Sequence, residues 1–223
     1  MTARSLFVTG TDTDVGKTRV ACALLRALTA AGKRCAGFKP VSAGLMQTAA
    51  GPRHEDALAL NAAASVKLPD ELLNPYCLPD ALAPHIVAAR KGIRLESERI
   101  LSAHQAIAAQ ADWIVIEGAG GWLVPLNERE TLADVVAIAG WPAILVVGMR
   151  LGCLNHALLS AESILRRAPL VGWIANELPP LQTALEENVA SLDLRLPAPR
   201  LARMRVQATD LEWSPGGRSA LGL

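Results

Sequence analysis

The sequence has few aromatic residues, almost no excess charge and no long apolar run. Aromatic residues make up 4% of the 223 residues, and 22 basic against 21 acidic side chains leave a formal net charge of +1. We therefore expect neither a base-stacking surface nor a general attraction to nucleic-acid phosphates. The longest apolar runs, such as Trp141–Met149, fall well short of the roughly 20 residues of a membrane helix, so no membrane span is predicted.

Cysteine is also scarce. Cys22, Cys35, Cys77 and Cys153 lie far apart without paired C-x-x-C spacing, which predicts neither a zinc cage nor a disulfide framework. The first residues lack the apolar stretch and the small-residue cleavage site of a secretory signal. We therefore expect reduced cysteines and a cytoplasmic location.

Uninterrupted apolar runs predict buried strands. They lie at Ser5–Thr9, Trp113–Ile116, Ala143–Val147 and Val171–Ala175, with a weaker fifth at Cys35–Lys39. Amphipathic helical patterns lie between the runs, at Val20–Ala31 and at Leu154–Leu165. This alternation predicts an α/β fold with a doubly wound, mainly parallel sheet and helices on both faces, which binds ligands at one sheet edge.

The length and apolar content fit a single domain over residues 1–223. Prolines break the stretch Gly44–Arg94 into short pieces, so we interpret it as an elaborated crossover with a helix near Glu55–Ala64. The pattern fades after Pro197, and a loosely held segment is expected over about 210–223.

The strongest local motif is Gly10-Thr11-Asp12-Thr13-Asp14-Val15-Gly16-Lys17-Thr18, which follows the first strand and opens the first helix. Its glycines let backbone N–H groups surround an anion, Lys17 can reach the terminal phosphates, and the Thr18 hydroxyl can hold Mg²⁺. The motif predicts a phosphate loop of the P-loop NTPase type. A glycine turn that happens to contain a lysine is the alternative.

A second motif, Glu117-Gly118-Ala119-Gly120-Gly121, follows the strand at Trp113–Ile116. A carboxylate at a strand end beside a phosphate loop is typical of a magnesium ligand, although a solvated acid before a tight turn fits the same residues. Lys39 ends the weak strand, where this fold binds ligands, or else lies over a sheet edge. Asp56 is either a helix-start acid or a second metal ligand.

Two asparagines are further candidates. Asn176 ends the strand at Val171–Ala175, where its amide either reads an adenine edge or caps the next turn. Asn155 lies in the first turn of a helix beginning near Gly152, where it either favours a bound carboxylate or caps the helix.

Together these motifs, with Phe38-Lys39-Pro40-Val41, Leu151-Gly152-Cys153-Leu154-Asn155-His156 and Trp173-Ile174-Ala175-Asn176, resemble dethiobiotin synthetase over the chain up to about Asn176. The resemblance implies an ATP- and Mg²⁺-dependent ligase that closes a cyclic urea on 7,8-diaminononanoate with CO₂ or bicarbonate as carbon source. It also implies a homodimer with the substrate site at the interface.

The resemblance assigns roles residue by residue. Lys17 and Lys39 would be catalytic, and Thr18, Asp56 and Glu117 would hold Mg²⁺. The ATP site would comprise Asp14, Val15, Gly16, Lys17, Thr18, Arg19, Asp56, Glu117, Gly118, Ala119, Gly120, Asn176 and Glu177. The substrate site would comprise Thr13, Lys39, Ser42, Ala43, Gly120, Gly121, Leu154 and Asn155, with Asn155 acting on the neighbouring subunit's substrate.

Three positions depart from the family pattern. Ala43 stands where a hydroxyl residue is common, and Ser42 could replace that hydroxyl only if the loop rotates. Arg150 stands where lysine is frequent, and the isoleucine-proline pair that often borders the adenine pocket is missing near Met204 and Arg205.

A rival interpretation is a partitioning or positioning ATPase, which uses ATP as a dimerisation switch and makes no product. Such proteins usually carry an extra lysine early in the loop, where this chain has Thr11, Asp12 and Thr13. A second rival, an amidase-linked synthase of the corrin pathway, needs a glutamine-hydrolysing domain for which 223 residues leave no room.

Overall fold

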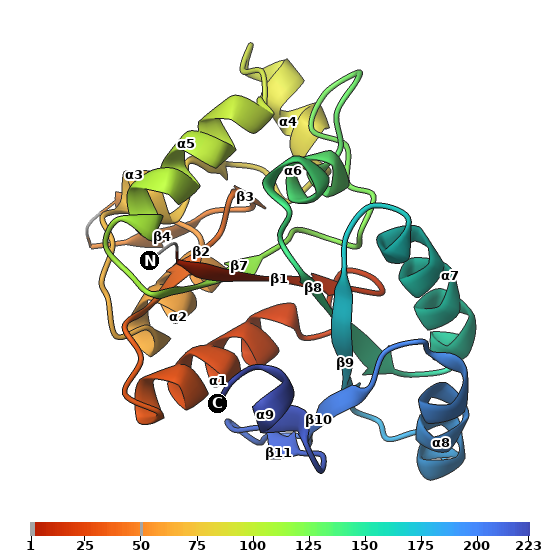
Figure 1. The fold of residues 1–223 in the computed structure, drawn as a ribbon. Helices are drawn as coiled ribbons and strands as arrows, with labels where there is room; N and C mark the ends of the chain where they lie inside the picture. The colour runs from red at the N-terminus through yellow and green to blue at the C-terminus, as the bar shows by residue number, and fades with distance from the viewer. Residues whose placement is uncertain (1–2, 50) are drawn as a thin grey trace.

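A computed structural model describes residues 3–49 and 51–223 (Figure 1). The strands are β1 (Arg4–Gly10), β2 (Cys35–Phe38), β3 (Val41–Ala43), β4 (Met46–Thr48), β5 (Gly51–Arg53), β6 (Tyr76–Leu78), β7 (Trp113–Glu117), β8 (Ala143–Met149), β9 (Leu170–Glu177), β10 (Arg200–Met204) and β11 (Glu212–Trp213). The helices are α1 (Lys17–Ala30), α2 (Glu55–Ala63), α3 (Asp70–Leu73), α4 (Pro84–Arg90), α5 (Ser97–Ala108), α6 (Leu132–Ala139), α7 (Cys153–Leu165), α8 (Leu185–Arg195) and α9 (Gly217–Ala220).

Seven strands form one sheet in the order β11-β10-β9-β8-β1-β7-β2. The pairings within it are parallel except that of β10 with β11, which is antiparallel. All five predicted strands are present, and the predicted helices appear as α1, α2 and α7. The expected doubly wound α/β sheet is confirmed.

Helices cover both faces of the sheet. Helices α1, α2 and α9 lie on one face, and α5, α6, α7 and α8 lie on the other (Figure 1). The strands carry continuous apolar residues because both of their faces are covered, and every residue of β7 and β8 is buried. None of the helices in residues 3–49 and 51–223 is long and apolar enough to cross a membrane.

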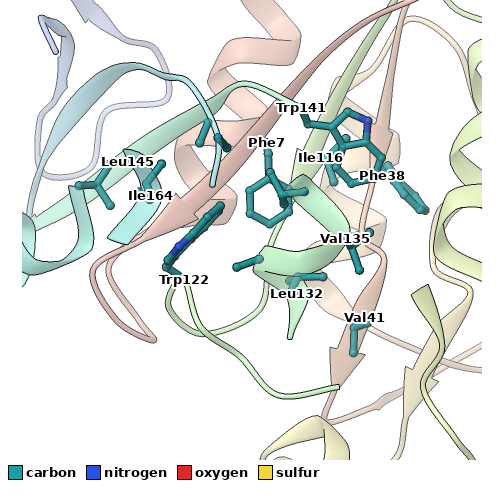
Figure 2. Close-up of a cluster of buried hydrophobic side chains, with 14 of the residues drawn as sticks. Phe7, Phe38, Val41, Ile116, Trp122, Leu132, Val135, Trp141, Leu145 and Ile164 are labelled. Carbon is teal, nitrogen blue, oxygen red and sulfur yellow. The ribbon is translucent and has the colours of Figure 1, made fainter. Parts of the chain in front are cut away.

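Phe7 of β1 is at the centre of a group of buried aromatic side chains. Its ring contacts Trp122 edge-on, with centroids 6.1 Å apart, and stacks on Trp141 at 6.4 Å (Figure 2). Phe7 also limits the turn after β7, since a Cβ at Gly118 would lie 2.9 Å from its Cζ atom. Aromatic packing therefore fixes the backbone that follows Glu117.

The crossover between β2 and α5 is elaborated, as expected. It contains α2, the parallel pair β3–β6 and the antiparallel hairpin β4–β5, together with the short helices α3 and α4. The pair β3–β6 places Val41–Ala43 beside Tyr76–Leu78 at the end of the sheet where Lys39 lies.

The C-terminal segment corrects one expectation. Residues 210–223, expected to be loosely held, form β11 and α9 against β10, and Leu211 and Leu221 are buried. A Cβ at Gly217 would lie 2.0 Å from the carbonyl oxygen of Leu201, which shows how closely this segment packs. The apolar pattern that predicts a strand is weak there because β10 itself contains Arg200 and Arg203.

His104 of α5 packs against the core. Its Nε2 atom is 2.8 Å from Ser5 Oγ, and its ring centroid is 4.6 Å from that of Trp141. Burial lowers the pKa of His104 from 6.5 to about 4, because the charged imidazole loses its hydration there.

This pKa shift predicts a pH dependence of stability. Between pH 6.5 and 4 the unfolded chain takes up a proton at His104 that the folded chain does not, so the free energy of unfolding should fall as pH falls. In the variant His104→Gln the free energy of unfolding should fall less between pH 7 and pH 5, as measured by urea unfolding at both pH values. The exposed His156→Gln is the control, and an equal decline in both variants would contradict the assignment.

Candidate active site

The phosphate loop connects β1 to α1 and turns sharply at Gly16. Gly16 has φ +87°, and a Cβ there would lie 2.1 Å from the side-chain nitrogen of Asn176. Gly16 is also the N-cap of α1 and has no side chain to accept from the first N–H groups of the helix. These N–H groups and the positive end of the helix are therefore open to an anion, as the sequence motif predicts.

Lys17 is the first residue of α1 and is 7% exposed. Its ammonium donates to the carbonyl oxygen of Asp12 at 2.8 Å, inside the same loop. Burial, followed by repulsion from Lys39, lowers the pKa of Lys17 from 10.5 to about 8. The two lysines therefore share one electrostatic environment.

Four polar side chains meet at the carboxyl ends of β2 and β7. Glu117 ends β7, Lys39 directly follows β2, Asp56 lies in the first turn of α2, and Thr18 follows Lys17. The Thr18 hydroxyl lies 2.8 Å from Asp56 Oδ1 and 2.8 Å from Glu117 Oε1. The three residues that the resemblance assigns to Mg²⁺ thus lie in one cluster, which also contains Lys39.

The Lys39 ammonium lies at the centre of this cluster. It donates to Asp56 Oδ2 and Glu117 Oε1 at 2.8 Å each, and to the carbonyl oxygen of Gly118 at 3.2 Å. Lys39 is 3% exposed and Glu117 is 1% exposed. Water therefore screens this ion pair only weakly.

The charges in the cluster shift one another's pKa values. Burial alone would lower the pKa of Lys39, but Glu117 and Asp56 together raise it above its ordinary value. Burial raises the pKa of Glu117 even though Lys39 opposes the shift. The pKa of the less buried Asp56 is lowered, because Lys39 and Thr18 outweigh its partial burial.

The cluster offers the oxygen ligands that a magnesium ion prefers. Within the described residues there is no group of three or more His, Cys, Asp or Glu side chains that could hold a metal alone. Two carboxylates and one hydroxyl are nevertheless the usual protein share of a Mg²⁺ site that substrate phosphates complete. The Oε2 atom of Glu117 is buried without a hydrogen-bond partner in the described structure, which is consistent with a ligand role.

These residues line a cleft of about 930 Å³ that has both charged and apolar lining residues. The charged ones include Lys17, Lys39, Asp56 and Glu117. The apolar ones are Ala43, Ala81, Leu82, Ala83, Pro84, Leu123, Val124 and Pro125. The cleft therefore offers charged groups to an anion and apolar surface to an aliphatic chain.

The glycine-rich turn after β7 also lines the cleft. Gly118 donates to the carbonyl oxygen of Val8 at 3.0 Å, and Gly120 has φ +56°. A Cβ at Gly120 would lie 3.7 Å from the Thr13 hydroxyl, so this turn and the phosphate loop face each other. Thr13, Ala119, Gly120 and Gly121 all line the cleft, and their contacts with ATP or substrate stay predictions.

Ser42 lines the cleft beside Ala43, but its hydroxyl is bonded inside the protein. It is 1% exposed, and its hydroxyl donates to Asn74 Oδ1 at 2.6 Å. Asn74 in turn donates to the carbonyl oxygen of Lys39 at 2.6 Å. In this arrangement Ser42 helps to hold the Lys39 backbone, and a substrate contact of Ser42 or Ala43 stays a prediction.

Asn176 lies behind the phosphate loop and is fully buried. Its amide donates to the carbonyl oxygen of Val15 at 2.8 Å and accepts from Arg19 at 3.3 Å. Arg19 also donates to the carbonyl oxygens of Arg205 and Ala208, and Glu177 pairs with Arg203 and Arg205. Asn176 therefore supports the loop, while contacts of Asn176 and Glu177 with a base stay predictions.

The first turn of α7 lies apart from the cleft of its own chain. Leu154 and Asn155 are not among the cleft-lining residues of the described structure, and Asn155 is exposed. The preceding Arg150 forms an ion pair with Asp12 of the phosphate loop. Leu151, next to it, is 97% exposed.

Some site residues were not singled out from the sequence. They are Asn74, His54, whose ring caps α2 by accepting from Asp56 N at 3.2 Å, and Asp12. His54 directly precedes the predicted helix at Glu55–Ala64, and this cap position was an available signal. Asn74 lies among the prolines of the crossover and offered none.

Comparisons with known proteins find relatives over most of the chain. A family model described as an AAA domain matches residues 4–209. The ATP-dependent dethiobiotin synthetase BioD of Pseudomonas paraeruginosa is 49% identical over 202 residues, which cover 90% of this chain and 89% of that protein. The ATP-dependent dethiobiotin synthetase BioD 1 of Escherichia coli strain K12 is 43% identical over 217 residues, covering 97% and 96%.

A solved structure supports the fold at much lower identity. The cell division protein FtsY of Thermotoga maritima superposes with a TM-score of 0.56 at 16% identity, over 99% of this chain and 69% of that one. At this identity the likeness shows a shared P-loop fold and nothing further.

The close approach of Gly16 to Asn176 gives a test of the phosphate loop. The variant Gly16→Ala should weaken nucleotide binding at least about tenfold, which corresponds to about 1.4 kcal/mol, because the new Cβ would meet Asn176 and the backbone would be strained. Calorimetric titration with ATP measures this change. Gly140→Ala is the matched control, since Gly140 also has a positive φ, of +65°, but open space around it. Normal affinity in Gly16→Ala would contradict the role of this contact.

Proposed function

Because the chain belongs to the ATP-dependent dethiobiotin synthetase family, we propose that it joins CO₂ to 7,8-diaminononanoate with ATP and Mg²⁺ to give dethiobiotin, ADP and phosphate, a step of biotin biosynthesis. The observation that carries the proposal is the composition of the cleft, which combines Lys17, Lys39 and two carboxylates with apolar lining residues. A diamine on an aliphatic chain and a triphosphate match this combination.

The proposed reaction has three bond-forming steps. One substrate amine attacks CO₂ and loses a proton, which gives a carbamate. A carbamate oxygen then attacks the γ-phosphorus as ADP leaves, which gives a carbamic-phosphoric anhydride. Finally the second amine attacks the carbamoyl carbon and loses a proton, and phosphate leaves as the ring closes.

The main physical obstacle is repulsion between the carbamate and the triphosphate. Two unit charges 4 Å apart interact with about 4 kcal/mol at an effective dielectric constant of 20. We assign Lys17, at the start of α1, to the space between the carbamate and the γ-phosphate, and Lys39 to the transferred phosphoryl group. Both ammonium groups lie in the same cleft, so they can offset this charge without a large rearrangement of the backbone.

Thr18, Asp56 and Glu117 are the residues that would hold Mg²⁺. The bound ion would neutralise charge on the β- and γ-phosphate oxygens. The unpartnered Oε2 atom of Glu117 and the shared position of Thr18 between both carboxylates support this assignment.

Phosphate release in the presence of each substrate tests the proposed function. With ATP, 7,8-diaminononanoate and bicarbonate together, the protein should release phosphate, and omitting either the diamine or bicarbonate should reduce the rate at least about tenfold. Mass spectrometry should detect dethiobiotin only in the complete mixture. Release that is indifferent to the diamine would instead support a switch ATPase that makes no small-molecule product.

We further propose a homodimer in which Leu154 and Asn155 approach the partner's substrate. Asn155 is exposed and outside its own cleft, and Leu151, Leu159 and Leu123 are 97%, 59% and 52% exposed. The free N–H groups at the start of α7 suit the substrate's carboxylate.

Mixed dimers test whether Asn155 acts across the interface. Alone, Asn155→Ala should raise the KM for the diamine with little change for ATP, and Lys39→Gln should be nearly inactive. If Asn155 acts on the partner's site, a mixed dimer of the two variants contains one site with both native residues. Mixing the variants should therefore restore sites with the original KM, measured by the phosphate-release assay. Absence of such sites would place Asn155 in its own chain's site.

A further inference from the structure

Lys39 uses all of its hydrogen-bonding capacity within the carboxylate cluster. An ammonium has three N–H donors, and three acceptors surround Lys39 Nζ: Asp56 Oδ2 at 2.8 Å, Glu117 Oε1 at 2.8 Å and the carbonyl oxygen of Gly118 at 3.2 Å. With 3% of its surface exposed, Lys39 has no hydration to replace any of these bonds. In this position Lys39 has no donor left for a phosphate.

The same two carboxylates are those assigned to a divalent cation. Thr18 lies 2.8 Å from one oxygen of each carboxylate, and one of these oxygens, Glu117 Oε1, also accepts from Lys39. A magnesium ion bound here would lie about 2.0–2.1 Å from its ligand oxygens. The ion and the ammonium would then be adjacent like charges in a buried site, so both cannot be present together.

We propose that Lys39 and a divalent cation compete for one binding site, which is formed by Thr18, Asp56 and Glu117. The cation can enter only when Lys39 leaves, and the triphosphate on the phosphate loop supplies the next partner for the displaced ammonium. Metal binding is therefore tied to nucleotide binding. This inference rests on the proposed function for the identity of the metal ligands.

The charges of the cluster support this coupling. Asp56, Glu117 and Lys39 together carry one net negative charge, whereas the two carboxylates alone carry two, which a divalent cation would neutralise. Lys39 can move toward the phosphate loop within one cavity, because Lys39, Lys17 and Gly16 line the same cleft. Burial and then repulsion from Lys39 lower the pKa of Lys17, so a displaced Lys39 ammonium needs an anion between it and Lys17.

Metal binding in the absence of nucleotide tests the proposal without reference to the reaction. The probe is Mn²⁺, whose free form gives an electron paramagnetic resonance signal that disappears on binding. Nucleotide-free wild-type protein should bind Mn²⁺ weakly, and Lys39→Met should bind it at least about tenfold more tightly, the change expected from about 1.4 kcal/mol. With a non-hydrolysable ATP analogue present, the two proteins should differ by less than about threefold.

Three further variants identify the cause of a tighter binding. Lys17→Met removes the same charge from the same cleft but leaves Lys39 on the carboxylates, so it should tighten Mn²⁺ binding much less. Lys91→Met, on the exposed surface, controls for the change of net charge. Adding Glu117→Gln to Lys39→Met should abolish the gain in Mn²⁺ affinity, because one carboxylate of the binding site is lost.

The outcomes separate this proposal from the proposed function. Equal or weaker Mn²⁺ binding by Lys39→Met, with its fold verified by thermal unfolding, would overturn the competition, as would an equal gain in Lys17→Met. Lys39→Gln, which keeps a polar end, is the substitute if Lys39→Met does not fold, with the same expected direction. A protein that shows the competition but releases phosphate without the diamine would refute the dethiobiotin reaction and leave the competition intact.

Discussion

The buried ion pair between Lys39 and Glu117 is the constraint around which the site is arranged. Both residues are almost fully buried, and each would be strongly unfavourable alone in that environment. Removing one partner of such a pair typically costs about 3–5 kcal/mol, because a buried charge is left uncompensated. The backbone positions that hold the two side chains opposite each other are therefore tightly constrained, and Thr18 and Asp56 complete the surroundings.

Parallel strand register produces this juxtaposition. Phe38 of β2 pairs with Ile116 of β7, so the next residues of the two strands, Lys39 and Glu117, come level at the same edge. Val8 of β1 pairs with Glu117, which brings the start of the phosphate loop to that edge as well. A slip of one residue in β7 would turn Glu117 to the opposite face of the sheet and leave Lys39 without its partner.

The part of the fold set by local pattern could be predicted from the sequence. The central strands are continuous apolar runs because helices cover both faces, and the phosphate loop is a local motif with its flanking strand and helix. Strand β10 could not be recognised, because Arg203 is buried there only through ion pairs with Glu177 and Glu186, which lie far away in the sequence. The orientation of Ser42 depends in the same way on the distant Asn74.

The sequence also placed the charged site residues at strand ends without showing that they share partners. Strand ends bring Lys39, Glu117 and the phosphate loop to one edge, but only distances show that Lys39 and Thr18 bond to the same carboxylates. A site rich enough in charge to attract a triphosphate and a divalent cation must keep those charges compensated before either arrives, because unpaired buried charges destabilise the fold. Ion pairs within the cluster provide this compensation. When a ligand binds, charged groups that are already in the site therefore exchange one partner for another. Lys39 is the group in this cluster that can make such an exchange, since a lysine ammonium on a flexible stem can move while the carboxylates stay.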